Sequence, residues 1–143
     1  MRLEPLYRIT FGYRERFGRG DELLLLAEGR CEGRVTGRFR GVNRARLLAG
    51  GAWLPELEGA VRTKDGATIL LRLTGRGRPD AEPVGRVVGS VTHTVDDPRY
   101  AWLNETVGAV AGEVFPGARI VLDVAALVWE PLAGSPRYDL SEA

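Results

Sequence analysis

The chain has 143 residues, which is enough for one domain with its own hydrophobic core and too few for two ordinary domains. Apolar residues make up 44% of the sequence, which excludes a disordered chain, and the 19 glycines follow no period, which excludes a collagen-like one. A net charge of +1 gives no general attraction to nucleic acids or membranes, so we expect neither as a partner.

The sequence predicts a cytoplasmic protein without an internal disulfide or a bound metal. Cys31 is the only cysteine and His93 the only histidine, so the usual Cys-rich and multi-histidine metal sites lack their ligands. Residues 1–5 are charged and lack the apolar segment of a signal peptide. The longest plain apolar run, residues 23–27, is far too short to cross a bilayer.

The first half of the chain predicts short strands separated by turns. Residues 3–11 alternate between apolar and polar positions, which is typical of a half-buried strand. Residues 12–20 are charged and contain glycine, and we expect a loop there. Residues 21–28 hold four consecutive leucines and predict a short strand or, as the less favoured alternative, one helical turn. Residues 30–48 alternate loosely between glycines, which predicts bent strands joined by tight turns.

The clearest local signal is a β-hairpin formed by residues 58–63 and 67–73. Between them, Asp65-Gly66 supplies the positive φ angle that a tight hairpin turn requires. Residues 75–83 are rich in glycine and proline and predict a loop. Residues 85–95 are rich in valine and threonine and predict another strand.

The last third predicts one helical turn and two more strands. Residues 97–103 resemble a short helical turn with Asp97 as its N-cap and Pro98 at its first position. Residues 105–114 and 119–129 predict the last two strands. Eight or nine short strands without a long amphipathic helix predict an all-β chain folded as a single antiparallel barrel or sandwich. We expect this domain to span residues 1–132, followed by a loose tail over residues 133–143.

Several blocks of residues occur in an order that is similar to a known family. They are Gly50-Gly51-Ala52-Trp53, Asp65-Gly66-Ala67-Thr68-Ile69, Asp97-Pro98-Arg99-Tyr100-Ala101-Trp102-Leu103-Asn104 and Val121-Leu122-Asp123-Val124, after the opening Leu3-Glu4-Pro5-Leu6-Tyr7. Together they resemble the domain-of-unknown-function family numbered 3237, also called uncharacterised protein family 0311, from about Leu3 to Leu132.

The resemblance implies a calycin-like or lipocalin-like antiparallel barrel of eight to nine strands with an interior pocket. It implies no settled reaction. Members of the family often carry an acidic residue between the alanine and tryptophan of the first block, whereas here Trp53 follows Ala52 directly. A role for that carboxylate is therefore not expected in this chain.

His93 is the main candidate for chemistry. It alternates in phase with Val91 and Val95, so it points into the barrel if those valines do. A histidine in an apolar cavity can act as a general acid or base. The alternative is a core or rim histidine whose hydrogen bonding is satisfied by one neighbour.

Asp123 and Tyr100 are candidates to assist His93. Asp123 interrupts the apolar run of residues 120–125, and a buried carboxylate needs a partner. It is therefore a second catalytic group or an orienting group for His93, or alternatively an outward-facing residue in an ion pair with an arginine. The second interpretation is favoured because arginine is plentiful.

Aromatic and polar side chains near these positions could line a ligand pocket. Arg99 and Asn104 flank the predicted helical turn, and Asn104 could polarise a substrate carbonyl or cap the turn. The aromatic candidates, for which core packing is the alternative, are Tyr7, Trp53, Tyr100, Trp102 and Trp129.

Residues 30–46 carry six arginines against the single acid Glu32. They form either a surface for an anionic ligand or a solvated face whose charges are paired across strands, and the second is favoured.

Two functions remain open from the sequence. The first is a cofactor-free enzyme of secondary metabolism that acts on a small apolar molecule by proton transfer, as an isomerase, cyclase or lyase. The second is a non-catalytic, lipocalin-type protein that binds a small apolar ligand. A homodimer formed through an exposed edge strand would fit either function.

Overall fold

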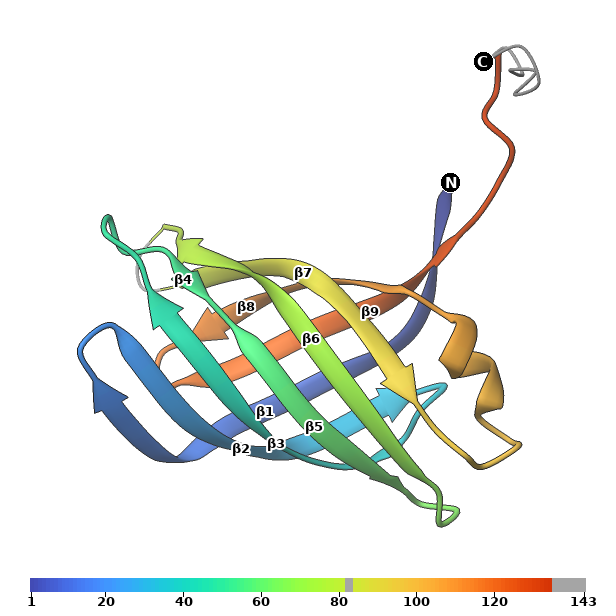
Figure 1. Cartoon of the computed structure of the whole chain (residues 1–143), viewed down its shortest axis with the longest axis horizontal. Coiled ribbons are helices and arrows are strands. Elements are labelled where there is room, and N and C mark those ends of the chain that lie inside the picture. The colour runs from blue at the N-terminus through green and yellow to red at the C-terminus, as the bar shows by residue number, and fades with distance from the viewer. Residues whose placement is uncertain (82–83, 135–143) are drawn as a thin grey trace, which may run out of the picture.

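The computed structural model describes residues 1–81 and 84–134. They form nine strands and one short 3₁₀ turn, arranged around a tilted barrel (Figure 1). The elements in chain order are β1 (Arg2–Arg19), β2 (Glu22–Gly33), β3 (Gly37–Leu47), β4 (Trp53–Leu54), β5 (Glu56–Thr63), β6 (Thr68–Pro79), β7 (Gly85–Thr94), η1 (Ala101–Glu105), β8 (Gly108–Phe115) and β9 (Arg119–Val128).

Eight of the strands close into one antiparallel barrel, which confirms the predicted fold class. With β4 left aside, each strand pairs with the next along the chain, so that β3 pairs with β5, and β9 returns to pair with β1. The short strand β4 is an extra element that touches both β3 and β6. Closure pairs β1 with β9 from Arg2 to Phe11, whereas residues 13–19 of β1 pair with β2 alone and leave one edge unpaired. The homodimer expected through an exposed edge strand stays a prediction.

Alternation along each strand builds the core. In β6, buried and exposed residues alternate from Thr68 to Arg78, so Ile69, Leu71 and Leu73 point into the barrel. Phe39 of β3 is fully buried in the middle of the chain's core. A side chain at Gly59 would place its Cβ only 2.4 Å from the ring of Phe39, so glycine at this position makes room for the ring.

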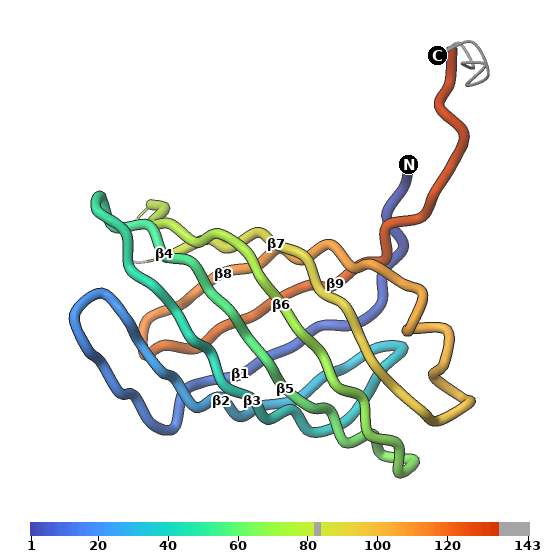
Figure 2. Tube along the Cα trace, in the orientation of Figure 1, coloured from blue at the N-terminus to red at the C-terminus, as the bar shows by residue number. Residues whose placement is uncertain are grey.

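The barrel has two ends that differ in structure. At one end lie η1, the β2–β3 turn and the β5–β6 turn, and we call this the η1 end. At the other end lie β4 and the β1–β2, β6–β7 and β8–β9 connections, and we call this the Trp53 end. The tube in Figure 2 shows both ends, with the N-terminus and the described segment after β9 leaving the barrel on the side of the η1 end.

The hairpin predicted around Asp65-Gly66 is confirmed as β5 and β6, with Gly66 at φ 93°. The loop expected over residues 12–20 is wrong, because β1 continues to Arg19 with a bulge between Tyr13 and Glu15. The loop expected from residue 75 is also wrong as far as Pro79, because β6 extends to that residue.

The helical turn is shorter and later than predicted. It begins at Ala101, with Tyr100 in the N-cap position, so Asp97 is not its cap. Asp97 instead accepts a hydrogen bond from the backbone N–H of Arg99, at 2.9 Å, within the preceding turn. Residues 82–83 of the expected loop and residues 135–143 of the expected tail lie outside the described residues.

Among the described residues, none forms a helix that is long and apolar enough to cross a membrane.

Candidate functional site

The site is built on a buried pair formed by Tyr7 and His93. Tyr7 lies on β1 and His93 on β7, and each side chain points into the barrel with 5% of its surface exposed. The Tyr7 hydroxyl and His93 Nε2 are 2.5 Å apart, and the two rings meet edge to face at 5.7 Å. The inward orientation predicted for His93 from its phase with Val91 and Val95 is therefore confirmed.

Burial keeps both members of this pair uncharged. Loss of solvent lowers the pKa of His93 to about 4. Loss of solvent, reinforced by the nearby Cys31, raises the pKa of Tyr7. Burial likewise raises the pKa of Cys31 to about 12. At neutral pH the end of the lumen around His93 therefore holds a neutral imidazole, a phenol and a thiol.

The second ring nitrogen of His93 is left without a partner. Nδ1 is buried and makes no hydrogen bond to any described residue. An orphaned buried polar atom typically costs about 1–3 kcal/mol of stability, so such atoms are uncommon in folded proteins. Nδ1 is thus the one buried side-chain nitrogen or oxygen atom among the described residues that lacks a hydrogen-bond partner.

The segment after β7, from Asp97 to Thr106, lies over the η1 end of the barrel, and we call it the cover. Leu103 of η1 is fully buried. Asn104 bonds both polar groups of its amide to Val95, donating from Nδ2 to the carbonyl and accepting at Oδ1 from the N–H, each at 2.8 Å. Asn104 therefore fastens the cover to the end of β7. It does not cap the turn, whose C-cap is Thr106.

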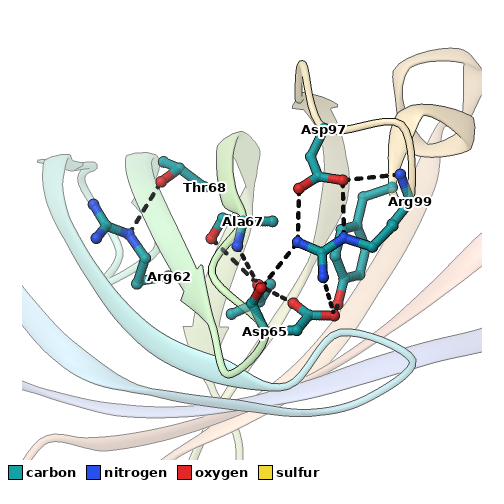
Figure 3. Close-up of polar contacts among 8 residues, drawn as sticks. Arg62, Asp65, Ala67, Thr68, Asp97 and Arg99 are labelled. Atoms are coloured by element: carbon teal, nitrogen blue, oxygen red, sulfur yellow. Dashed lines mark hydrogen bonds and ion pairs between the residues drawn. The ribbon is translucent and has the colours of Figure 1, made fainter.

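A cluster of charges ties the cover to the β5–β6 turn, as Figure 3 shows. Arg99 donates to both carboxylate oxygens of Asp97 and to the backbone carbonyl of Asp65. Tyr100 donates its hydroxyl hydrogen to Asp65 Oδ2 at 2.8 Å. The hydrogen bonds from Arg99 hold the pKa of Asp97 at about 2. We call Asp65, Asp97, Arg99 and Tyr100 the rim cluster.

The rim cluster places two predicted site residues outside the lumen. The Tyr100 hydroxyl is engaged with Asp65, and the Arg99 side chain is 51% exposed. The hydrogen bonds of both side chains go to Asp65 and Asp97. Their role in this structure is to join the segment that precedes η1 to the hairpin opposite.

Asp123 does not assist His93, which corrects its assignment as a catalytic residue, and the favoured alternative of an outward-facing ion pair with an arginine is confirmed. Its carboxylate lies on the outer face of β9 and receives two hydrogen bonds from Arg8 of β1, at 2.7 and 3.0 Å. These bonds lower the pKa of Asp123. The physical reason is alternation: Leu122 and Val124 point inward, so the residue between them points outward.

The tryptophans are distributed around the barrel and line no common pocket. Trp102 packs at the η1 end, where the guanidinium of Arg34 lies 4.2 Å from its ring. Trp129 is 82% exposed beyond the end of β9. Trp53 lies at the opposite end, against Gly77, where a Cβ would overlap its indole.

The interior is more tightly filled than the resemblance implies. A hollow of about 30 Å³ lies inside the barrel at the Trp53 end, and His93 is not among its lining residues. Its polar groups belong to Tyr13 and Asn43, whose amide donates to the Tyr13 hydroxyl at 2.9 Å. The carbonyl oxygen of Asn43 also accepts from the N–H of Glu56.

Tyr13 and Asn43 were not predicted as site residues. Asn43 follows Gly41 and Phe39 at even spacing, and that alternation was the one signal that could have placed it inside. Within residues 1–81 and 84–134, no three Asp, Glu, His or Cys side chains gather in an arrangement that could hold a metal ion.

Comparisons with known proteins show what the fold resembles. A scan of family models and a search of curated protein sequences find no match to the chain. A β-barrel-like protein from Acinetobacter baumannii AYE is 21% identical, with a TM-score of 0.76, over 87% of this chain and 94% of that chain.

Two further solved structures share the fold. A conserved protein of unknown function from Rhodopseudomonas palustris is 16% identical, with a TM-score of 0.78, over 89% of this chain and 97% of that chain. An enzyme from Penicillium herquei is 18% identical, with a TM-score of 0.59, over 86% of this chain and 93% of that chain. The TM-scores show that the chain shares the fold of these proteins. At sequence identities this low, the comparison shows the fold alone.

Proposed function

We propose that this barrel is a cofactor-independent enzyme that moves a proton on a small apolar molecule, with the Tyr7–His93 pair as its working group. The observation that carries the proposal is the buried pair itself, in which one ring nitrogen of His93 is held by Tyr7 and the other has no partner among the described residues. Buried groups with shifted pKa values occur most often at functional sites.

The pair suits proton abstraction next to a carbonyl. A neutral imidazole can take the substrate proton at Nδ1, while Nε2–H donates to the oxygen of Tyr7. The imidazolium then compensates the enolate that forms, and it returns the proton to a different carbon, so no other reactant is consumed. Because the pKa of His93 lies at about 4, the base is weak, and the substrate needs an acidified C–H bond.

Access to Nδ1 requires movement of the cover. His93 is almost fully buried, and the hollow of about 30 Å³ is much smaller than a usual ligand pocket of about 300–1,000 Å³. The segment from Asp97 to Thr106 is the element to move, because the rim cluster and Asn104 hold it by a few polar contacts. Such covers commonly open on the microsecond to millisecond timescale.

Two likenesses add support. The Penicillium herquei protein with this fold is an enzyme, which is consistent with catalysis on such a barrel. The resemblance to family 3237 is compatible with a small molecule held in the interior, and membership of that family is part of the proposal. Both are analogies of fold, so the chemistry depends on the site residues alone.

The second candidate is non-catalytic binding of a small apolar ligand. It is favoured by the hollow at the Trp53 end, where apolar side chains surround the polar pair of Tyr13 and Asn43. In that case the ligand would displace Trp53, and His93 would be part of the core.

Deuterium exchange separates the two candidates. Small enolisable ketones and unsaturated lactones are incubated in D₂O with the protein, with His93→Gln, or with Asn43→Ala as the matched control at the other end of the lumen. We expect the protein to speed deuterium incorporation into at least one probe, and His93→Gln to lose about 10²-fold of that rate or more. Circular dichroism checks that each variant is folded.

The alternative outcomes are equally informative. Equal rates for the protein and folded His93→Gln would exclude the proton-transfer role. Suppose that those rates are equal and that Asn43→Ala abolishes binding of the same probes, measured by tryptophan fluorescence. The binding candidate then replaces the enzymatic one.

A further inference from the structure

Three arginines stand directly opposite one another on the outer face of the barrel. Arg30 of β2 is in register with Arg38 of β3, and Arg38 is in register with Arg62 of β5. All three side chains are exposed. Like charges placed directly across neighbouring strands are destabilising. We call these three residues the arginine row.

Two other arginines on the outer surface face carboxylates directly across the strands. Arg40 is opposite Glu28 with an ion pair of 3.4 Å, and Arg72 is opposite Glu58 with one of 3.0 Å. The paired face favoured from the sequence for residues 30–46 is therefore correct at Arg40. The arginine row departs from the pattern of its own neighbours.

Little negative charge is present to neutralise the row. Glu32 pairs with Arg30 at 3.1 Å. Arg62 donates to the hydroxyl of Thr68, as Figure 3 shows. Among residues 1–81 and 84–134, no carboxylate lies within 4.0 Å of the charged groups of Arg38, Arg62 or the neighbouring Lys64.

A groove of about 440 Å³ lies over the row. Its lining includes four cationic side chains and one carboxylate, which leaves three positive charges. This volume falls within the usual range of small-molecule sites, about 300–1,000 Å³. The groove lining contains no aromatic ring, so nothing there would stack on a nucleobase. The full lining is Arg30, Cys31, Glu32, Thr36, Gly37, Arg38, Arg62, Thr63 and Lys64.

The geometry favours a linear anion. Neighbouring strands are about 4.8 Å apart, so the backbone positions of the three arginines span about 10 Å in a line. Guanidinium groups bind phosphate oxygens through paired N–H donors, and Lys64 adds a point charge beside the row. A single phosphate would meet only part of this line, whereas a chain of phosphates would follow it.

We propose that the groove over Arg30, Arg38 and Arg62 is a binding site for a linear oligophosphate, recognised through its phosphates alone. The site is on the outer face of the barrel and does not depend on the chemistry of the lumen.

Calorimetric titration with inorganic triphosphate tests this proposal. We expect saturable binding that weakens as salt is raised. Arg38→Gln should weaken the binding at least tenfold, because it removes the central cation. The matched control is Arg40→Gln, which removes an equal charge from the same strand and face, and should change the affinity by less than about twofold because Arg40 is already paired with Glu28.

Two results would overturn the proposal. One is an absence of saturable triphosphate binding by the unmodified chain at low salt. The other is equal weakening by Arg38→Gln and Arg40→Gln, which would indicate general charge attraction. ATP serves as the second ligand: affinity equal to that of triphosphate supports recognition of phosphates alone, whereas preferential binding of a single-stranded DNA oligonucleotide would contradict it.

Discussion

The chemistry of the lumen depends on two residues that are far apart in sequence. The alternation around His93 predicted its inward direction, but its partner Tyr7 is 86 positions away. The sequence could not supply this pairing, because it arises only when β1 and β7 face each other across the closed barrel. Alternation also predicts the outward direction of Asp123, because its neighbours Leu122 and Val124 point inward.

The depressed pKa of His93 should make stability depend on pH. The unfolded chain binds a proton with a pKa near 6.5 and the folded chain only at about 4, so protonation favours unfolding. The free energy of unfolding should therefore fall as pH decreases from about 6.5 to about 4, by at most about 3 kcal/mol. Urea unfolding of the protein and of His93→Gln measures the effect. An identical pH slope for both in this range would contradict the assignment.

Ala118 should be a site of backbone strain. It has a φ of 58° in the β8–β9 turn, where glycine is favoured over residues with a Cβ. We expect Ala118→Gly to raise the free energy of unfolding by about 0.5–1 kcal/mol. The matched control, Ala111→Gly in the extended strand β8, should lower it by a similar amount. Destabilisation by both substitutions would show that residue 118 is not strained.

The long hairpin of β1 and β2 explains why one element was misjudged. Residues 14–19 of β1 are mostly exposed, so the apolar alternation that marks a strand is missing there. Similarly, β6 continues through glycines that suggested a loop. Gly75 approaches the backbone of β7 so closely that a Cβ would lie 2.3 Å from the carbonyl oxygen of Val88. Glycine at position 75 therefore permits a close approach of two strands that a local pattern does not reveal.

The rim cluster should control how easily the cover opens. Arg99 is the residue through which Asp97 and the Asp65 turn are joined. Arg99→Gln should speed the amide hydrogen exchange of Leu103 and Thr106 while leaving that of the barrel strands unchanged, because only the cover loses contacts. The control is Arg72→Gln, an exposed paired arginine remote from η1.

The same hydrogen-exchange data can contradict the claim that the rim cluster holds the cover in place. If Arg99→Gln leaves the exchange of Leu103 and Thr106 unchanged, the cover does not depend on the rim cluster. If exchange instead rises throughout the barrel, Arg99 supports global stability and does not act as a local fastening.

At the scale of the whole molecule, composition and strand spacing predicted an antiparallel barrel or sandwich, and the family resemblance favoured the closed barrel that the structure shows. They did not predict how full its interior is. That property depends on where glycines face large rings, as Gly59 faces Phe39 and Gly77 faces Trp53. Such pairs are set by register between strands, which one sequence does not specify. The roomy lumen expected at first is therefore replaced by a packed core with a buried polar pair.

The most direct test is an NMR titration of the imidazole nitrogens of His93, which is unambiguous because the chain has one histidine. The account predicts a neutral ring from pH 8 down to about 4, with a ring-nitrogen shift that changes in Tyr7→Phe. A midpoint near 6.5 with no response to Tyr7→Phe would mean that the ring is solvated and unpaired, and would contradict the proposed proton-transfer site.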